Sequence, residues 1–287
     1  MTSGQDDMAF VHHGSRSKQK LAMRIAIITD IHEDVQSLKK ALRMIEIEKC
    51  DYIVCLGDIL GYPYMRARYE GTRNASECIS LVKRHCRIVL LGNHDLFHLS
   101  KVPSSPAGFE FPDNWYDLGA EEKLAAGGGR VWNYSDDHRT PLTEAETEYL
   151  LSLPESCIKE FNDKRVLFSH FVFPNLTGYV STLNGEMRDL AAHFGFMKQN
   201  TCELSICGHM HIEGIGIGYE PGEGLLSRLF HGFNYYSYGE RKLKNKACSV
   251  TVPALADNSQ VNGFAVFDSL THSITALSLN TNRRFIL

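Results

Sequence analysis

The chain has 287 residues, of which 43% are hydrophobic and 22% charged, and it has a net charge of −4 at pH 7. These values are those of an ordinary globular protein that is long enough to bury a large core. The small negative charge argues against a protein that holds nucleic acid or an anionic membrane surface by charge alone. No apolar run approaches the roughly 18 to 20 residues that a membrane-spanning helix needs.

The first 22 residues differ from the rest of the chain. They are polar and aperiodic, and they lack the apolar core that a secretory signal requires. We expect residues 1–22 to be a flexible extension or the product of an upstream start, because so polar a stretch cannot bury enough apolar surface to become ordered. The folded domain is then expected to span residues 23–287.

The cysteines predict a reducing environment. The chain contains eight of them and no CxxC pair, and several, among them Cys55 and Cys207, lie inside apolar runs. This pattern favours buried, reduced thiols over a framework of disulfides. We therefore expect a cytoplasmic protein.

Short apolar runs mark the expected strands. Five such runs cover residues 24–29, 52–56, 87–91, 165–168 and 203–207. Beyond residue 212 the chain becomes β-rich, with three further stretches and no helical pattern between them. These stretches cover residues 247–252, 263–268 and 273–279.

Helical patterns separate the early strands. In residues 32–49, apolar side chains recur at helical spacing. Asn74 is the expected N-cap of a second helix, and Thr143 with Glu146 forms a capping box that opens a third. Early alternation of strands and helices, followed by mainly antiparallel strands, predicts an α/β fold of two packed sheets flanked by helices.

Residues 98–140 fit neither pattern. They contain three prolines and a run of three glycines, which favour turns over regular elements. We expect an inserted lobe or a long surface excursion. Trp115 and Trp132 lie within it and could stack on a nucleobase, although packing the lobe itself is the more common use of such residues.

Polar residues follow directly after each of the five early strands. The stretches read "TDIH", "LGD", "GNHD", "SH" and "CGHMH". Loops beyond the carboxyl ends of strands converge on the ligand crevice of an open α/β sheet, so these residues could meet at one place. A single aspartate or histidine there is more often a cap or a turn former, but five such endings together predict a shared metal site.

The spacing within these endings suits a metal. Asp30 and His32, like His209 and His211, are two residues apart, so on an extended strand both side chains of a pair point to the same face. Such pairs can bind one metal or reach toward two. Because no cysteine stands at a ligand position, the mixture of carboxylate and imidazole favours Mn, Fe, Zn, Ni or Co in a catalytic site over a structural zinc site.

The five endings, in this order between residues 30 and 211, resemble the motifs of the calcineurin-like metallophosphoesterases. The resemblance implies a four-layer α/β/β/α sandwich with two divalent or transition metal ions. By position, it implies one metal bound by Asp30, His32 and His211, a second bound by Asn93, His170 and His209, and Asp58 as a bridge between the two.

The resemblance also implies a role for the residue after Asn93. His94 would act as general acid or as hydrogen-bond donor to the phosphate, with Asp95 a candidate to orient it. Two metals that share a hydroxide can lower its pKa to near neutrality and offset the charge of the phosphoryl transition state. The expected reaction is hydrolysis of a phosphate ester by this metal-activated hydroxide.

The sequence departs from the family pattern in two places. Many relatives read "DIHGN", whereas Glu33 and Asp34 follow His32 here. These carboxylates could disfavour a highly anionic substrate, or they could complement the N-terminus of the next helix. The stretch "GDILGYP" lacks the arginine that eukaryotic-type Ser/Thr phosphatases place after this Gly-Asp, and it looks more like bacterial phosphodiesterase-type relatives.

Substrate contacts are expected on the loop that follows Asp58. Arginine can grip a phosphate through two N–H groups. The candidates on this loop are Tyr62, Tyr64, Arg66 and Arg68. We predict substrate binding by Tyr62, Arg66 and Arg68, with a solvated loop as the alternative.

Together these features predict a soluble, dinuclear-metal-dependent phosphoesterase that acts on phosphodiesters or small phosphorylated compounds. One alternative is a phosphomonoesterase or Ser/Thr protein phosphatase, and another is a non-catalytic metal-binding scaffold, because function belongs to the site and not to the fold. The expected partner is a small phosphorylated substrate. No stable nucleic acid partner and no membrane are expected, and the oligomeric state is not predicted.

Overall fold

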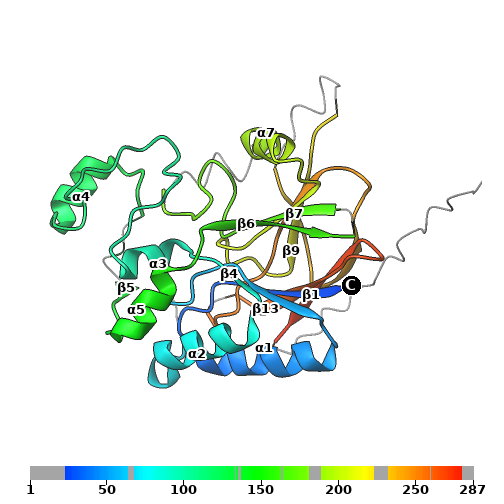
Figure 1. Ribbon diagram of the computed structural model, residues 1–287, viewed down its shortest axis with the longest axis horizontal. Coiled ribbons are helices and arrows are strands. Elements are labelled where there is room, and N and C mark those ends of the chain that lie inside the picture. Colours follow the sequence, from blue (N-terminus) through cyan, green and yellow to red (C-terminus); the bar gives the residue numbers. More distant parts are fainter. Residues whose placement is uncertain are drawn as a thin grey trace, which may run out of the picture.

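The structure is a computed structural model of the chain, and it describes residues 23–63, 68–132, 134, 137–162, 164–180, 189–222, 232–258 and 260–279. The predicted N-terminal extension lies outside the described residues. Two six-stranded sheets pack face to face, with helices on both outer faces (Figure 1). The predicted four-layer α/β/β/α sandwich is confirmed.

The first sheet joins early and late parts of the chain. Its order is β11-β14-β13-β1-β2-β4. Its strands are β1 (Arg24–Ile28), β2 (Tyr52–Cys55), β4 (Ile88–Val89), β11 (Gly239–Lys242), β13 (Gly263–Asp268) and β14 (Ser273–Ser278). Strands β1, β2 and β4 run parallel to one another, and β13 is antiparallel to β1. The strand predicted at residues 87–91 is shorter than expected, because the chain leaves the sheet after Val89.

The second sheet has the order β10-β9-β12-β8-β7-β6. Its strands are β6 (Ser156–Phe161), β7 (Lys164–Ser169), β8 (Leu204–Cys207), β9 (Ile215–Tyr219), β10 (Asn234–Tyr236) and β12 (Cys248–Thr251). Strands β7 and β8 are parallel, so their carboxyl ends meet at one edge of this sheet. A small separate ribbon pairs β3 (Tyr62–Pro63) with β5 (Asp137–His138).

Successive side chains of β1 point to opposite faces of the sheet, so this one strand contributes to two hydrophobic cores. Ile25 and Ile27 are fully buried in the core that both sheets share. Ala26 and Ile28 point the other way, into the core between the first sheet and its helices. The near-continuous apolar run at this strand is therefore explained by burial on both faces.

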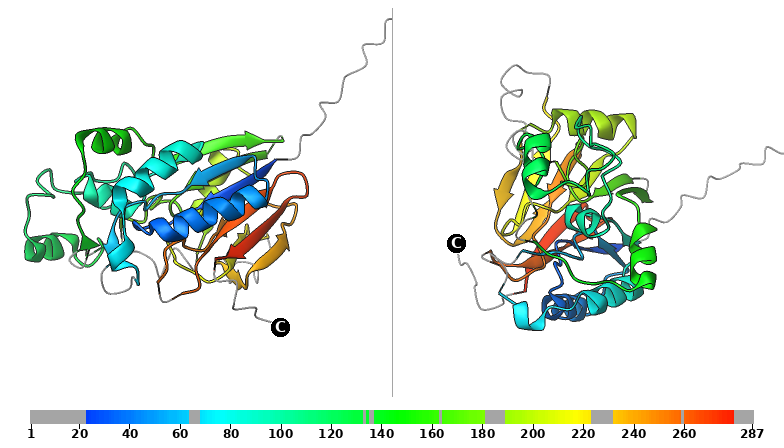
Figure 2. Two further views of the ribbon diagram at one scale, coloured as in Figure 1. Left: turned by 90° about the horizontal axis from the view of Figure 1, so that it is seen from below. Right: turned by 90° about the vertical axis from the view of Figure 1, so that its left-hand side faces the viewer.

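Helices cover the outer face of each sheet (Figure 2). On the first sheet lie α1 (Val35–Ile47) and α2 (Ala75–His85), and on the second lies α7 (Ala191–Gln199). The predicted caps are confirmed: Asn74 accepts a hydrogen bond from the Glu77 backbone N–H, and Thr143 with Glu146 caps α5 (Glu144–Leu151).

The predicted insertion contains little regular structure. It begins near the end of α3 (Asn93–His98) and contains α4 (Ala120–Gly127), which lies outside the sandwich, at the left of Figure 1. Trp115 is buried and packs edge-on against Phe109 and Phe111, so this tryptophan packs the lobe. The boundaries of the insertion stay a prediction. The remaining short element, η1 (Glu70–Thr72), precedes α2.

All eight cysteines lie in the described residues and are free thiols. Five are buried, as predicted, and three are partly exposed. Burial raises the pKa of the Cys55 thiol well above its ordinary value and that of Cys207 to about 12. In the described part of the chain, no helix is both long enough and apolar enough to span a membrane.

Matched isoleucines test the shared core. Ile25 is fully buried, whereas Ile47 at the end of α1 is 76% exposed. We expect Ile25→Ala to lower the free energy of unfolding by about 2–5 kcal/mol, because it removes buried methyl groups and leaves a cavity. Ile47→Ala should change it by less than ~0.5 kcal/mol. Chemical denaturation followed by circular dichroism measures both, and equal losses would contradict the two-sided core.

Candidate metal centre

The predicted ligands lie on tight turns just beyond the strands. Asp30, His32, Asp58, His209 and His211 all have left-handed backbone conformations, with φ between 47° and 69°. The expectation that an extended strand aligns each pair is therefore wrong, although the side chains do converge. A non-glycine residue in this conformation costs about 1–3 kcal/mol and persists only where the surroundings enforce it.

Backbone contacts enforce these turns. The N–H groups of Ile31 and His32 both donate to the Asp58 carbonyl, at 2.8 and 2.9 Å. Gly92 packs so closely against the Asp58 carboxylate that a Cβ at this position would collide with it. The glycine before Asn93 is thus required by close approach of the turns after β2 and β4.

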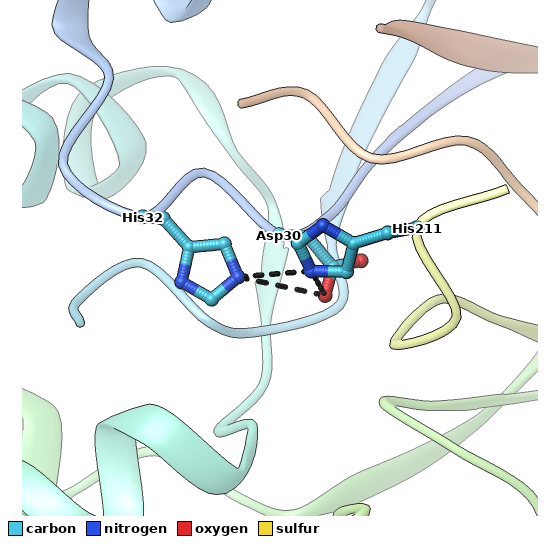
Figure 3. Close-up of side chains that lie close together, drawn as sticks. All are labelled: Asp30, His32 and His211. Carbon is cyan, nitrogen blue, oxygen red and sulfur yellow. Dashed lines mark hydrogen bonds and ion pairs between the residues drawn. The ribbon is translucent and has the colours of Figure 1, made fainter. Parts of the chain in front are cut away.

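Asp30, His32 and His211 form the first group of candidate ligands (Figure 3). The Nε2 atom of His211 lies 3.3 Å from Asp30 Oδ1 and 3.1 Å from His32 Nε2. Asp30 and His32 come from the turn after β1, whereas His211 comes from the turn after β8. Both sheets therefore contribute to this group, as the prediction requires.

Asp58, His170 and His209 form the second group. His170 Nε2 lies 3.1 Å from Asp58 Oδ2 and 3.2 Å from His209 Nδ1. The Asp58 Oδ2 atom also lies 3.8 Å from His32 Nε2 of the first group. Asp58 consequently lies between the two groups, where the resemblance expects a bridge.

The second polar atom of most ligands is already held by the protein. His32 Nδ1 lies 2.9 Å from the Gly61 carbonyl and His170 Nδ1 lies 3.0 Å from the Leu56 carbonyl. The other carboxylate oxygen of Asp58 accepts a hydrogen bond from the His94 backbone N–H. These contacts turn the Nε2 atoms and Asp58 Oδ2 toward the centre, as backbone partners do for metal ligands.

Asn93 is the remaining predicted ligand. Its Nδ2 donates to the Tyr134 hydroxyl at 3.1 Å. Its Oδ1 atom is buried and has no hydrogen-bond partner among the described residues. Asp30 Oδ1 is also buried without such a hydrogen bond, although His211 Nε2 lies 3.3 Å from it. Buried oxygens without a partner are costly. A cation would satisfy both.

These donors fit two metal ions. Oxygen and imidazole donors without thiolate suit divalent transition metals. One ion would be held by Asp30, His32 and His211, the other by Asn93, His170 and His209, with Asp58 between them.

The charge state of the imidazoles also suits metal binding. Burial, together with the neighbouring His94, lowers the pKa of His32 to about 4. Burial and His170 lower the pKa of His209 to about 3. Both rings are neutral at pH 7, so each has a lone pair for a metal.

His170 differs from these two rings. Burial alone would lower its pKa, but the Asp58 and Asp30 carboxylates outweigh burial and raise the pKa to about 9. A metal at this position would have to displace the proton of His170.

His94 lies beside both groups and is oriented by a residue that the sequence did not reveal. Its Nδ1 lies 2.6 Å from Asp137 Oδ2, and the side chain of Asp137 is 1% exposed. Burial alone would lower the pKa of His94, but Asp58, Asp137 and Asp95 raise it to about 9. Its ring also belongs, with His32 and Asp58, to a group whose ligand atoms lie within 4.8 Å of one another.

The carboxylate of Asp95 bonds to the backbone, whereas the described partner of the His94 ring is Asp137. Its Oδ1 accepts hydrogen bonds from the backbone N–H groups of Ile59 and Leu60, and its Oδ2 accepts one from Gly92. Both oxygens are thus used to tie α3 to the loop after β2. Asp137 lies within the insertion, in a stretch for which the sequence predicts no helix or strand. Its carboxylate contacts the ring of His94.

The two carboxylates after His32 are both engaged. Asp34 is the N-cap of α1, where its side chain accepts a hydrogen bond from the Ser37 N–H. Glu33 is buried and pairs with Arg73 at 3.0 Å and with Thr140 at 2.9 Å. Asp34 therefore has the helix-capping role that was one of the two alternatives.

The predicted substrate contacts are Tyr62, Arg66 and Arg68. Arg66 and the side chain of Tyr62 lie outside the described residues. Arg68 is exposed, and its backbone N–H donates to the Asp257 carbonyl. All three contacts stay predictions. Trp132, in contrast, has its ring 6.0 Å from that of His209.

Comparisons with known proteins identify the family and the fold. A sequence model of the family described as calcineurin-like phosphoesterase matches residues 23–213. An uncharacterised protein of Methanocaldococcus jannaschii is 29% identical over 146 residues, which are 51% of this chain and 48% of that protein. The chain therefore matches about half the length of this relative.

Two solved structures share the fold. A metallophosphoesterase from Sphaerobacter thermophilus has a TM-score of 0.58 at 22% identity, covering 90% of this chain and 88% of that one. A hypothetical protein from Pyrococcus horikoshii has a TM-score of 0.51 at 16% identity, covering 89% and 87%. At these identities the likeness shows the fold alone. Because the family match extends from β1 through the loop after β8 and so includes every predicted ligand, this chain belongs to the calcineurin-like phosphoesterase family.

Proposed function

We propose that this protein is a dinuclear-metal-dependent phosphoesterase. The observation that carries the proposal is the convergence of two groups of mostly buried candidate ligands on Asp58, with the amide oxygen of Asn93 buried and without a hydrogen-bond partner among the described residues. When bound, two such ions lower the pKa of a water molecule and offset the negative charge that develops on a phosphoryl group. The chain itself supplies the geometry and the proton for the leaving group.

His94 is the proposed general acid. Its Nδ1 is held by Asp137, which leaves Nε2 for the substrate. The three surrounding carboxylates favour its protonated form and raise its pKa, although burial opposes them. A protonated imidazole can donate to the leaving oxygen of an ester, which is otherwise a poor leaving group. This pairing of His94 with Asp137 favours a catalyst over a non-catalytic scaffold.

The surrounding charges favour a diester substrate over a monoester. In the described part of the chain, no lysine or arginine forms an ion pair with a proposed ligand, and Arg73 is paired with Glu33, the residue after His32. A phosphate monoester has one more negative charge than a diester near neutral pH, and it usually requires a further cation such as arginine. We therefore propose phosphodiesters or small phosphorylated compounds as substrates, with a phosphomonoester as the second candidate. Free, mostly buried thiols support a cytoplasmic location.

A panel of two substrates tests the function. Protein reconstituted separately with Mn, Fe, Zn, Ni and Co is assayed on bis(4-nitrophenyl) phosphate and on 4-nitrophenyl phosphate. We expect metal-dependent hydrolysis with the higher kcat/KM on the diester. Hydrolysis of the monoester alone would favour the second candidate, and inactivity on both substrates with every metal would leave only the scaffold.

His94→Ala tests the proton donor. The side chain of His94 lies beside the proposed metal ligands and is not one of them, so we expect the metal content to be kept. The value of kcat should fall by about 10²- to 10⁴-fold, the usual size of acid–base effects. The loss should be largest on an ester with a poor leaving group. Unchanged turnover of such an ester would refute the role of His94, and loss of metal would identify the residue as a ligand.

Asp137→Asn tests the orientation and charge of His94. A raised pKa means that the ring stays protonated until the pH rises through that pKa, and the Asp137 charge contributes to the raised value. Without this charge the pKa of His94 should fall, so the alkaline decline of kcat should begin at lower pH than in the wild type. The control is Asp113→Asn, an exposed aspartate of the same lobe. Identical profiles for all three proteins would contradict the pairing.

A further inference from the structure

A cavity of about 170 Å³ lies in the insertion beside the proposed metal centre. Its walls are mainly aromatic and come from α3, α4, the chain before β5 and the loop after β7. The principal lining residues are Phe97, Trp115, Leu124, Trp132, Tyr134 and Tyr179. Leu124 on α4 is 64% exposed and marks the side that is open to solvent. An apolar cavity of roughly 150 Å³ is sufficient for one benzene ring.

Two of the lining residues also contact the metal centre. The Tyr134 hydroxyl accepts the hydrogen bond from Asn93, and the Tyr134 ring lies 5.3 Å from the ring of His94. The Trp132 ring lies edge-on to His209, 6.0 Å away. The cavity is thus one side-chain layer from Asn93, His209 and His94. It lies on the side of the centre formed by Asn93, His209 and the proposed general acid His94.

The indole of Trp132 has a hydrogen-bond donor without a described partner. Its Nε1 atom is buried and has no acceptor among the described residues. A buried indole N–H normally finds a partner. The donor belongs to a side chain that lines the cavity, so a bound molecule with an acceptor could supply the missing partner.

We propose that this cavity is the subsite for a planar aromatic ring with a hydrogen-bond acceptor, as the leaving group of the phosphoester substrate. This inference rests on the proposed function, because the phosphate would bind at the metal centre. The ring packs against the aromatic walls, and its acceptor takes the N–H of Trp132. An aliphatic leaving group would gain neither the ring contacts nor this hydrogen bond.

Phosphonates test the subsite without turnover, since their C–P bond is not hydrolysed. The probes are ethylphosphonate, benzylphosphonate and the three isomers of pyridylmethylphosphonate, measured by calorimetry on the Mn-loaded protein and as inhibitors of diester hydrolysis. We expect benzylphosphonate to bind about 5- to 100-fold more tightly than ethylphosphonate, as aromatic stacking usually provides. At least one pyridyl isomer should bind more tightly than benzylphosphonate.

Two variants assign the effect to Trp132. Trp132→Phe should keep the preference for benzylphosphonate over ethylphosphonate and lose the additional gain of the pyridyl isomer, because only the N–H is removed. Trp132→Ala should reduce both the preference for benzylphosphonate over ethylphosphonate and the additional gain of the pyridyl isomer. Tyr235→Ala, which removes an exposed aromatic side chain on β10, is the control and should change neither.

The outcomes separate the subsite from the catalytic function. Equal binding of ethyl and benzyl probes by a protein that hydrolyses diesters would overturn the subsite and leave the function standing. The expected order of binding in a protein without hydrolysis would support the subsite and overturn catalysis. If no phosphonate binds to the Mn-loaded protein, the subsite is refuted, and the hydrolysis assay then decides the function separately.

Discussion

The structure depends on one electrostatic constraint, the burial of several carboxylate and imidazole groups at a single point. Asp30 and Asp58 are both buried, and burial alone would raise their pKa values. The histidines around them more than offset burial and hold both pKa values below the ordinary value. Positive charge is therefore required at this point. Metal ions provide it more strongly than protonated imidazoles, and the turns that hold the ligands are strained to keep the donor atoms together.

The fold brings these groups together through two separate sheets. The parallel strands β1, β2 and β4 end at one edge of the first sheet, and β7 and β8 end at one edge of the second. The buried core between the sheets then fixes the distance between their ligands. Loss of packing in this core would separate the groups that share Asp58. With metal bound as proposed, stability and metal binding would therefore be coupled.

Much of this arrangement could be predicted from the sequence, because its signals are local. Apolar runs identified the strands that end in ligands, and the caps at Asn74 and Thr143 identified two helices. Helix α7 has a weakly amphipathic sequence and was missed. The left-handed turns at Asp30 and His209 were also missed, because hydrogen bonds between distant turns impose them and no local pattern encodes them.

Asp137 shows the same limit at the site. It lies in a stretch without periodicity, and its contact with His94 spans 43 positions of sequence. Asp95 is nearer to His94 in sequence and was the predicted partner, but its oxygens accept hydrogen bonds from three backbone N–H groups. Proximity in sequence is a poor guide to the partner of a side chain that stands at a junction of several loops.

The metal content of the purified protein tests the central claim most directly. After loading with Mn and removal of free metal, elemental analysis should find about two ions per chain in the wild type. Asp58→Asn should bind markedly less, because Asp58 lies between both groups of ligands. Fewer than one ion per chain in the wild type, or the same content in both proteins, would contradict the account.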